Sequence, residues 1–121
     1  MGGSECHLLK AFKGKECYAY FKVAPALKLH ITNGVSVEVV YFDADADGHL
    51  RLDYDSNEKI RNPAYTQSKE YVRLKGTQQW RTARFVLENP RFEGRQNDGA
   101  DFRVVALSPR LFVRSVRVSP E

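Results

Sequence analysis

Residues 41–56 read YFDADADGHLRLDYDS and contain the strongest local signal in the chain. Apolar and polar residues alternate on both sides of Asp47-Gly48, which is the pattern of two half-buried strands. Asp-Gly between two such runs favours a tight hairpin, because both residues tolerate a positive φ. The stretch therefore predicts an all-β fold that includes a hairpin with an acidic tip.

The same alternation continues along most of the chain. We expect strands at residues 17–23, 26–32, 35–42, 49–55, 69–75, 80–87, 101–107 and 110–119. Turn residues separate these segments, and no span longer than one or two turns shows helical periodicity. About eight or nine strands at this spacing predict an antiparallel β-sandwich of two sheets, of the jelly-roll kind.

Length and composition indicate one ordinary globular domain. The chain has 121 residues, of which 42% are hydrophobic and 28% charged. Residues 1–16 are polar and begin like a cloning or excision scar, so we expect an N-terminal segment followed by a single module at residues 17–121. No secretory signal is visible, and no apolar run approaches the roughly 18 residues that span a bilayer, so we expect no membrane partner.

The charge is unevenly distributed. The net charge is +4, but residues 1–60 carry −2 and residues 61–121 carry +6, mostly from arginine. An acidic partner, such as nucleic acid or an anionic polysaccharide, is one interpretation, and a solvated surface is the other. We favour the second, because the arginines are dispersed and no nucleic-acid signature is present. We therefore expect no nucleic-acid partner.

Two further patterns bear on chemistry. Cys6 and Cys17 could form one disulfide in a secreted protein or remain free thiols, and two cysteines alone cannot make a zinc site. Nucleophile elbow, P-loop and dinucleotide motifs are missing, and the three histidines are scattered. We therefore do not expect an enzyme.

The second half of the chain contains motifs that resemble a known family. WRTARFVL at residues 80–87 is followed by RFEGRQN at 91–97 and GADFRV at 99–104. With YFD at 41–43 and LDYDS at 52–56, these strings resemble the non-catalytic jelly-roll modules of bacterial secreted glycoside hydrolases and related enzymes. The resemblance covers about residues 18–118 and implies carbohydrate binding.

The resemblance also implies a biological setting. We expect a secreted module, monomeric and joined in one polypeptide to a parent glycoside hydrolase, that holds the enzyme near its polysaccharide. Tethering would make weak single-site binding useful by raising the local concentration. The alternatives are a structural or interdomain sandwich without a glycan and a small catalytic sandwich such as a lyase.

Sugar binding requires flat aromatic faces and planar polar side chains. The candidates are outward-facing or loop residues: Tyr18, Tyr20, Lys22, His30, Tyr65, Tyr71, Trp80, Arg95, Asn97 and Arg103. The tyrosines could instead cover an ordinary half-buried sheet, and Trp80 could be a structural anchor. Arg103 could pair with Asp101 or with an acidic residue on a neighbouring strand, and we favour such pairing.

The acidic tip raises the question of calcium. Asp43, Asp45 and Asp47 precede Gly48 at the spacing that opens a calcium loop. An EF-hand is excluded, because position 12 is Tyr54 and the flanking segments are strands. A structural calcium held by the three aspartates is one prediction, and a solvated turn is the alternative. The resembled modules often hold calcium with ligands from distant segments.

Overall fold

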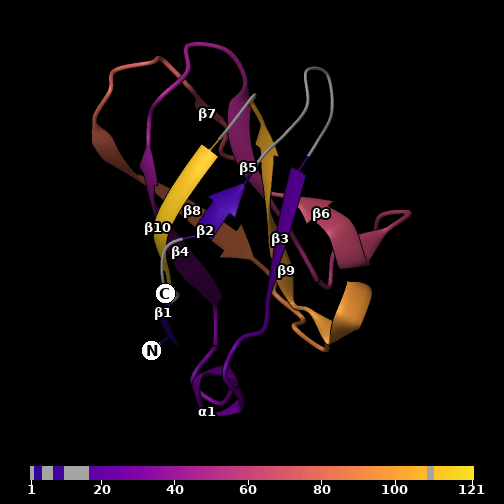
Figure 1. Ribbon diagram of the computed structural model, residues 1–121. Helices are drawn as coiled ribbons and strands as arrows, with labels where there is room; N and C mark the ends of the chain where they lie inside the picture. Colours follow the sequence, from indigo (N-terminus) through magenta and orange to yellow (C-terminus); the bar gives the residue numbers. More distant parts are fainter. Residues whose placement is uncertain (1, 4–6, 10–16, 109–110) are drawn as a thin grey trace.

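The computed structural model describes residues 2–3, 7–9, 17–108 and 111–121, which form two antiparallel sheets packed face to face (Figure 1). Sheet A contains β1 (Gly2–Gly3), β2 (His7–Leu9), β4 (Gly34–Phe42), β8 (Trp80–Glu88) and β10 (Leu111–Pro120). Its order is β1-β10-β4-β8, and β2 also pairs with β10. Part of the expected N-terminal segment therefore contributes to this sheet.

Sheet B is built on the other side of the core. It contains β3 (Cys17–Phe21), β5 (His49–Tyr54), β6 (Thr66–Gln67), β7 (Val72–Arg73) and β9 (Phe102–Leu107). Its order is β3-β9-β5-β6, and β7 also pairs with β5. The predicted all-β sandwich of two antiparallel sheets is confirmed.

The long strands alternate between the sheets along the chain. β3, β5 and β9 belong to sheet B, whereas β4, β8 and β10 belong to sheet A. Residues 43–48 therefore connect the two sheets, and the predicted hairpin between β4 and β5 is wrong. Asp47-Gly48 permits a reversal of the chain, but the burial of both strands' apolar faces in one core decides where each strand pairs.

The core lies between the sheets and explains the alternation in the sequence. Each strand places every second side chain inward, as the pleat requires. The inward residues that are fully or almost fully buried include Val35, Val37, Val39, Tyr41, Leu50, Leu52, Phe85, Leu87, Phe102, Val104, Val113 and Val116. Burying each such side chain contributes about 1.5–3 kcal/mol relative to leaving it exposed. The remaining side chains of each strand face outward.

Two expected strands differ from the structure. Residues 26–32 contain α1 (Pro25–Lys28), a single turn in which only Leu27 is buried, while Leu29 is 83% exposed. Pro25 suits the start of a helix because its φ is preset and it needs no N–H partner there. Residues 69–75 form only the short β7. Two 3-10 turns, η1 (Pro63–Tyr65) and η2 (Asn97–Gly99), occupy the loops next to sheet B.

Two other expectations concern the compartment. None of the helices in the described residues has the length and apolar character needed to cross a membrane. Cys17 is a half-buried free thiol at the start of β3. Cys6, the other half of the disulfide alternative, lies outside the described residues.

Candidate functional site

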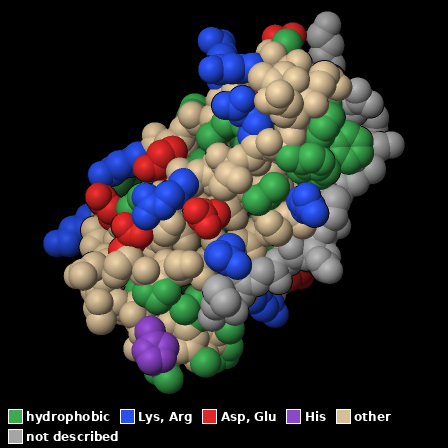
Figure 2. All heavy atoms as spheres, turned by 90° about the vertical axis from the view of Figure 1, so that its left-hand side faces the viewer, with side chains coloured by type: hydrophobic (Ala, Val, Ile, Leu, Met, Phe, Trp, Pro, Cys, Tyr) green, Lys and Arg blue, Asp and Glu red, His purple; other side chains and the backbone are tan. Residues whose placement is uncertain are grey.

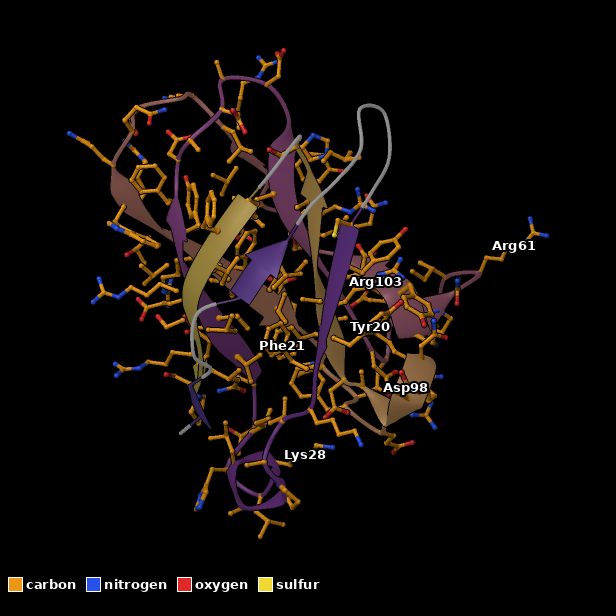
Figure 3. The ribbon with its side chains drawn as sticks, in the orientation of Figure 1. Tyr20, Phe21, Lys28, Arg61, Asp98 and Arg103 are labelled. Atoms are coloured by element: carbon orange, nitrogen blue, oxygen red, sulfur yellow. The ribbon has the colours of Figure 1, made fainter. Side chains whose placement is uncertain are left out.

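A row of polar side chains crosses the outer face of sheet B. The strand register aligns Tyr20 of β3 with Arg103 of β9, Arg103 with Asp53 of β5, and Asp53 with Gln67 of β6. The neighbouring residues in these strands face the core, so the row faces outward. Figure 3 shows Tyr20 and Arg103 on the outer side of sheet B, whereas Phe21 lies between the sheets.

Arg103 lies at the centre of this row. Its Nε and Nη2 lie 2.9 and 2.8 Å from Asp53 Oδ2, and its Nη1 donates to the Tyr20 hydroxyl at 3.1 Å. Burial alone would lower the pKa of Arg103, but the hydrogen bonds to Tyr20 and Asp53 outweigh it and raise that pKa. The guanidinium is therefore permanently charged and held in place. Arg103 pairs with the neighbouring strand's Asp53, as one of the two alternatives predicted, and not with Asp101.

Tyrosine rings enclose the guanidinium of Arg103. Its central carbon lies 3.9 Å from the ring centroid of Tyr18, 4.2 Å from that of Tyr65 and 5.9 Å from that of Tyr20. Stacked cation–π contacts of this kind stabilise both the charge and the ring orientations. Tyr18 remains 38% exposed. The ring faces turned toward Arg103 are covered, so a ligand would have to use the opposite faces, the ring edges and the hydroxyl groups.

The loop that contains η2 holds this arrangement together. The backbone N–H of Asn97 donates to the Tyr65 hydroxyl at 2.9 Å, and its side-chain amide donates to the Tyr20 hydroxyl at 3.3 Å. The amide of the buried Gln96 donates to the carbonyl oxygens of Asp53 (3.0 Å) and Ala64 (2.7 Å). This loop therefore clamps η1, and with it Tyr65, onto β5.

We name this group, Tyr18, Tyr20, Asp53, Tyr65, Asn97 and Arg103, the Arg103 cluster. Five of its six residues were predicted as site residues, and the structure brings them together from four separate segments. Asp53 was not predicted as a site residue, although the alternation of β5 places its side chain on the outer side of the sheet. Gln96 belongs to the same polar loop as Arg95 and Asn97, but the sequence did not indicate that it supports the cluster from a buried position.

Two predicted residues lie at the border of the cluster. Arg95 donates to the buried Asp55 at 2.7 Å and to the Ser56 carbonyl at 2.8 Å, so it anchors its own loop. Lys22 is exposed, and its ammonium lies 3.8 Å from the point where a Gly99 side chain would begin. Lys22 therefore lies over η2, near the cluster.

Three predicted residues lie elsewhere. His30 is exposed after α1. Tyr71 stacks on His49, with ring centroids 5.0 Å apart, and donates to Gln67 at 2.8 Å near the edge of sheet B. Trp80 lies on the outer face of sheet A, where it is 46% exposed and meets Phe42 edge-on at 5.3 Å. Trp80 is therefore a surface residue and not part of the core.

The acidic segment at residues 43–47 contains one structural carboxylate. Asp43 is buried and accepts hydrogen bonds from the backbone N–H groups of Lys75, Gly76 and Thr77 at 3.0–3.1 Å and from the Thr77 hydroxyl at 2.9 Å. Burial would raise the pKa of Asp43, but these bonds outweigh it and hold that pKa below its usual value. Asp43 thus clamps the loop that leads into β8.

This role bears on the calcium prediction. Both oxygens of Asp43 receive N–H or O–H donors, whereas a cation requires lone pairs directed at itself. Asp45 is half-buried and Asp47 is exposed. In the part of the chain that the structure describes, no three His, Cys, Asp or Glu side chains gather in a metal-holding group. Calcium at Asp43, Asp45 and Asp47 stays a prediction.

Comparison with known proteins supports the fold. No family model matches the sequence, and no curated protein matches it by sequence. The structure is similar to the C-terminal CBM6, a carbohydrate-binding module, of LamC, a marine laminarinase from Zobellia galactanivorans, with a TM-score of 0.55 over 98% of this chain and 91% of that chain. This chain has the fold of that module. At 10% identity the likeness concerns the fold, and it confirms the jelly-roll resemblance drawn from the sequence motifs.

On this fold, the Arg103 cluster is a rigid, amphipathic surface. The tyrosines offer apolar ring area together with hydroxyl groups, and Arg103 and Asn97 offer planar N–H donors. All of these groups are already hydrogen-bonded or stacked to one another, so binding would immobilise few side chains.

Proposed function

We propose that this protein is a non-catalytic carbohydrate-binding module that binds a polysaccharide or oligosaccharide through the Arg103 cluster. The observation that carries the proposal is the convergence of Tyr18, Tyr20, Tyr65, Asn97 and Arg103 on one outward face. Ring surfaces combined with planar hydrogen-bonding groups are what sugar rings and hydroxyls require. The similar fold of the LamC module supports the same conclusion.

The binding mode follows from the covered ring faces. Because Arg103 occupies one face of Tyr18 and of Tyr65, a sugar would pack on the solvent-exposed part of the Tyr18 ring and on the exposed edges of the cluster. Tyrosine hydroxyls and the Asn97 amide would hydrogen-bond to sugar hydroxyls. Such a shallow site gives modest affinity, because little surface is buried.

The proposed setting follows from modest affinity. We infer that the module is secreted and monomeric and that it belongs to a larger polysaccharide-degrading enzyme. Attachment to that enzyme raises the effective concentration of catalytic domain at the glycan, so a weak contact suffices. A structural sandwich without a glycan is the rival function.

Calcium at residues 43–47 would add a stabilising ion. Removal of calcium by a chelator would then lower the melting temperature of the protein.

The test compares two exposed tyrosines on sheet B. Tyr18→Ala removes a ring from the Arg103 cluster, and Tyr71→Ala removes a ring stacked on His49 outside it. In native gels that contain a retarding polysaccharide, Tyr18→Ala should lose most of the retardation of the wild type. We expect about a tenfold loss of affinity, the size of one aromatic contact. Tyr71→Ala should migrate like the wild type.

Two outcomes would contradict the proposal. Equal losses in the two variants would place the site away from the Arg103 cluster. A wild-type protein that is not retarded by any neutral or acidic polysaccharide in a broad panel would favour the structural sandwich.

A further inference from the structure

Strand β8 is the last strand on one side of sheet A, and the first half of its outer edge is open. We propose that this open edge, formed by residues 80–84, binds an extended acidic segment of a partner protein as an additional strand. Edge strands present unpaired N–H and C=O groups with which another chain can pair. This role goes beyond carbohydrate binding, because the open edge shares no residue with the Arg103 cluster.

The contact of Val86 shows which backbone groups of β8 point away from β4. The Val86 N–H donates to the Glu70 carboxylate at 3.3 Å, and Glu70 lies outside sheet A. Alternate residues of an antiparallel strand turn their N–H and C=O groups to the same side, so Trp80, Thr82 and Arg84 do so as well. Among the residues that the structure describes, none hydrogen-bonds to these backbone groups. They are therefore open to a further strand.

The second half of the same edge is closed by the chain itself. Lys69 and Glu88 form an ion pair at 2.6 Å, and with the Glu70 contact this places residues 69–70 against the end of β8. No comparable contact covers the described residues 80–84, where Thr82 and Arg84 are exposed. Proteins commonly block an edge with a proline or a bulge. β8, all of which is described, contains neither, and its register with β4 runs without a shift.

The charges around the open edge favour an acidic partner. Arg81 and Arg84 belong to the edge and are exposed. Lys75 lies beside its beginning, because the Lys75 N–H donates to Asp43, which follows the register partner of Trp80. Figure 2, which faces the outer side of sheet A, shows Lys and Arg side chains distributed over that side. Carboxylates on an added strand would meet these cations.

Arg84 and Glu70 show how such a strand would be held. The ion pair of Arg84 with Glu121 uses its Nη2 at 2.8 Å, whereas a guanidinium has five N–H donors in all. The Glu70 carboxylate already accepts a backbone N–H of this edge. An added acidic strand would combine main-chain hydrogen bonds with charge-assisted bonds to arginine, and the exposed Trp80 ring offers apolar contact area.

The same charges disfavour a second copy of this chain as the occupant. Antiparallel pairing of two open edges would centre on Thr82 and bring the arginines of both chains together. Residues 80–84 contain no acidic side chain that could separate these charges. Like charges on neighbouring strands are destabilising. An acidic segment of another protein meets no such repulsion.

Two variants of one residue test the main-chain contact. Thr82→Pro removes the N–H that points to the open edge, and proline is tolerated there because pairing with β4 does not use that N–H. Thr82→Ala is the matched control, since it keeps the N–H and removes only side-chain atoms. The probe is a short synthetic peptide in which glutamate alternates with valine. The control peptide has lysine in place of every glutamate.

NMR titration of the protein with each peptide measures the binding. The acidic peptide should shift the amides of residues 80–84 in the wild type and in Thr82→Ala with similar affinity. Thr82→Pro should weaken the binding about tenfold, and Arg84→Glu should do the same through charge. The lysine peptide should not bind. Raising the salt concentration from about 0.05 to about 0.5 M should weaken binding of the acidic peptide several-fold.

Three results would overturn the inference. Equal affinity of Thr82→Pro and Thr82→Ala would show that the backbone edge does not bind the peptide. Equal binding of the lysine peptide would exclude selection of an acidic segment. Dimerisation of the wild type that Thr82→Pro abolishes, measured by analytical ultracentrifugation, would identify a second copy as the occupant.

Two controls complete the experiment. An unchanged dispersion of the amide spectrum verifies that Thr82→Pro is folded, and Arg84→Glu tests the site independently if it is not. Tyr18→Ala should bind the acidic peptide like the wild type, because Tyr18 lies on sheet B. Thr82→Ala should keep the polysaccharide retardation of the wild type. Failure of peptide binding would therefore leave the proposed carbohydrate function intact.

Discussion

Four buried aspartates, Asp43, Asp53, Asp55 and Asp101, each accept hydrogen bonds from distant parts of the chain. Asp101, for example, receives the backbone N–H of Val23 at 2.8 Å and the Lys28 ammonium at 3.2 Å. A buried carboxylate is costly unless it is paired in this way. These aspartates therefore hold loops of the sandwich in place and, at Asp53, link two neighbouring strands.

Asp43 provides a test of this role. Asp43→Asn keeps the size of the side chain but turns an amide toward N–H donors, so we expect a loss of about 1–3 kcal/mol in the free energy of unfolding at neutral pH. Asp47→Asn, in the same segment but exposed, is the matched control and should have little effect. Urea unfolding of both variants measures the difference.

The pH dependence gives a second readout for Asp43. Its pKa is lowered in the folded protein, so its contribution is fully present above the unfolded value near about 3.9 and is lost as the pH falls through the folded pKa. The difference in the free energy of unfolding between the wild type and Asp43→Asn should therefore become smaller only below about pH 4. If the wild type and Asp43→Asn had the same free energy of unfolding at pH 7, the hydrogen bonds of Asp43 would contribute nothing to stability. An equal loss in Asp47→Asn would show the same.

Among the elements, the connections between the sheets impose the strictest backbone requirements. Gly48 has a φ of +100°, and a Cβ there would lie 1.6 Å from the carbonyl oxygen of Leu107. Gly76, in the neighbouring connection, has a φ of +68°, and its nearest contact would be 3.1 Å, to the backbone nitrogen of Ala46. Both glycines need a positive φ, but only at Gly48 would a Cβ atom overlap with the neighbouring backbone.

Alanine substitutions separate these two requirements. Gly76→Ala should cost about 1–2 kcal/mol, the price of a left-handed conformation. Gly48→Ala should cost clearly more, because the connection must also move away from β9. Thermal unfolding of the two variants shows which one loses more stability. A Gly48→Ala variant as stable as Gly76→Ala would show that residues 43–48 can shift away from β9 at little energetic cost.

The whole molecule presents two outer faces of different chemistry on one rigid core. The Arg103 cluster on sheet B is internally bonded and centred on a charge, whereas the outer face of sheet A combines an aromatic row, Phe42, Trp80 and Phe112, with Glu38, Arg84, Arg114 and Arg117.

A non-catalytic role makes a prediction for the intact protein. Incubated with the polysaccharide that it binds, the purified protein should release neither reducing nor unsaturated sugar ends. The physical reason is that sugar hydrolysis requires two carboxylates placed at a suitable separation in a cleft, and the buried carboxylates described here are all engaged in structural hydrogen bonds. Measurable release that grows with time would identify an enzyme, such as a lyase.

The sequence alone showed which side chains of each strand face inward and which face outward. Alternation with period two placed Leu50 and Leu52 inward and Tyr18, Tyr20 and Arg103 outward, because the pleat of a strand is a local property. The two-sheet fold followed from the same pattern, whereas the described residues form ten strands, several of them only two or three residues long, in place of the expected eight or nine. The candidate site was therefore predicted as a set of residue types on outward positions.

Only the tertiary structure decided which strands pair and which side chains meet. Asp47-Gly48 has the local signature of a hairpin, yet β4 and β5 lie in different sheets, because pairing is set by long-range burial. Tyr65, Gln96 and Asn97 come from irregular loops whose positions depend on hydrogen bonds to residues about 30 to 80 positions away. No local pattern encodes such contacts, so the enclosure of Arg103 by tyrosines emerged only when the chain was folded.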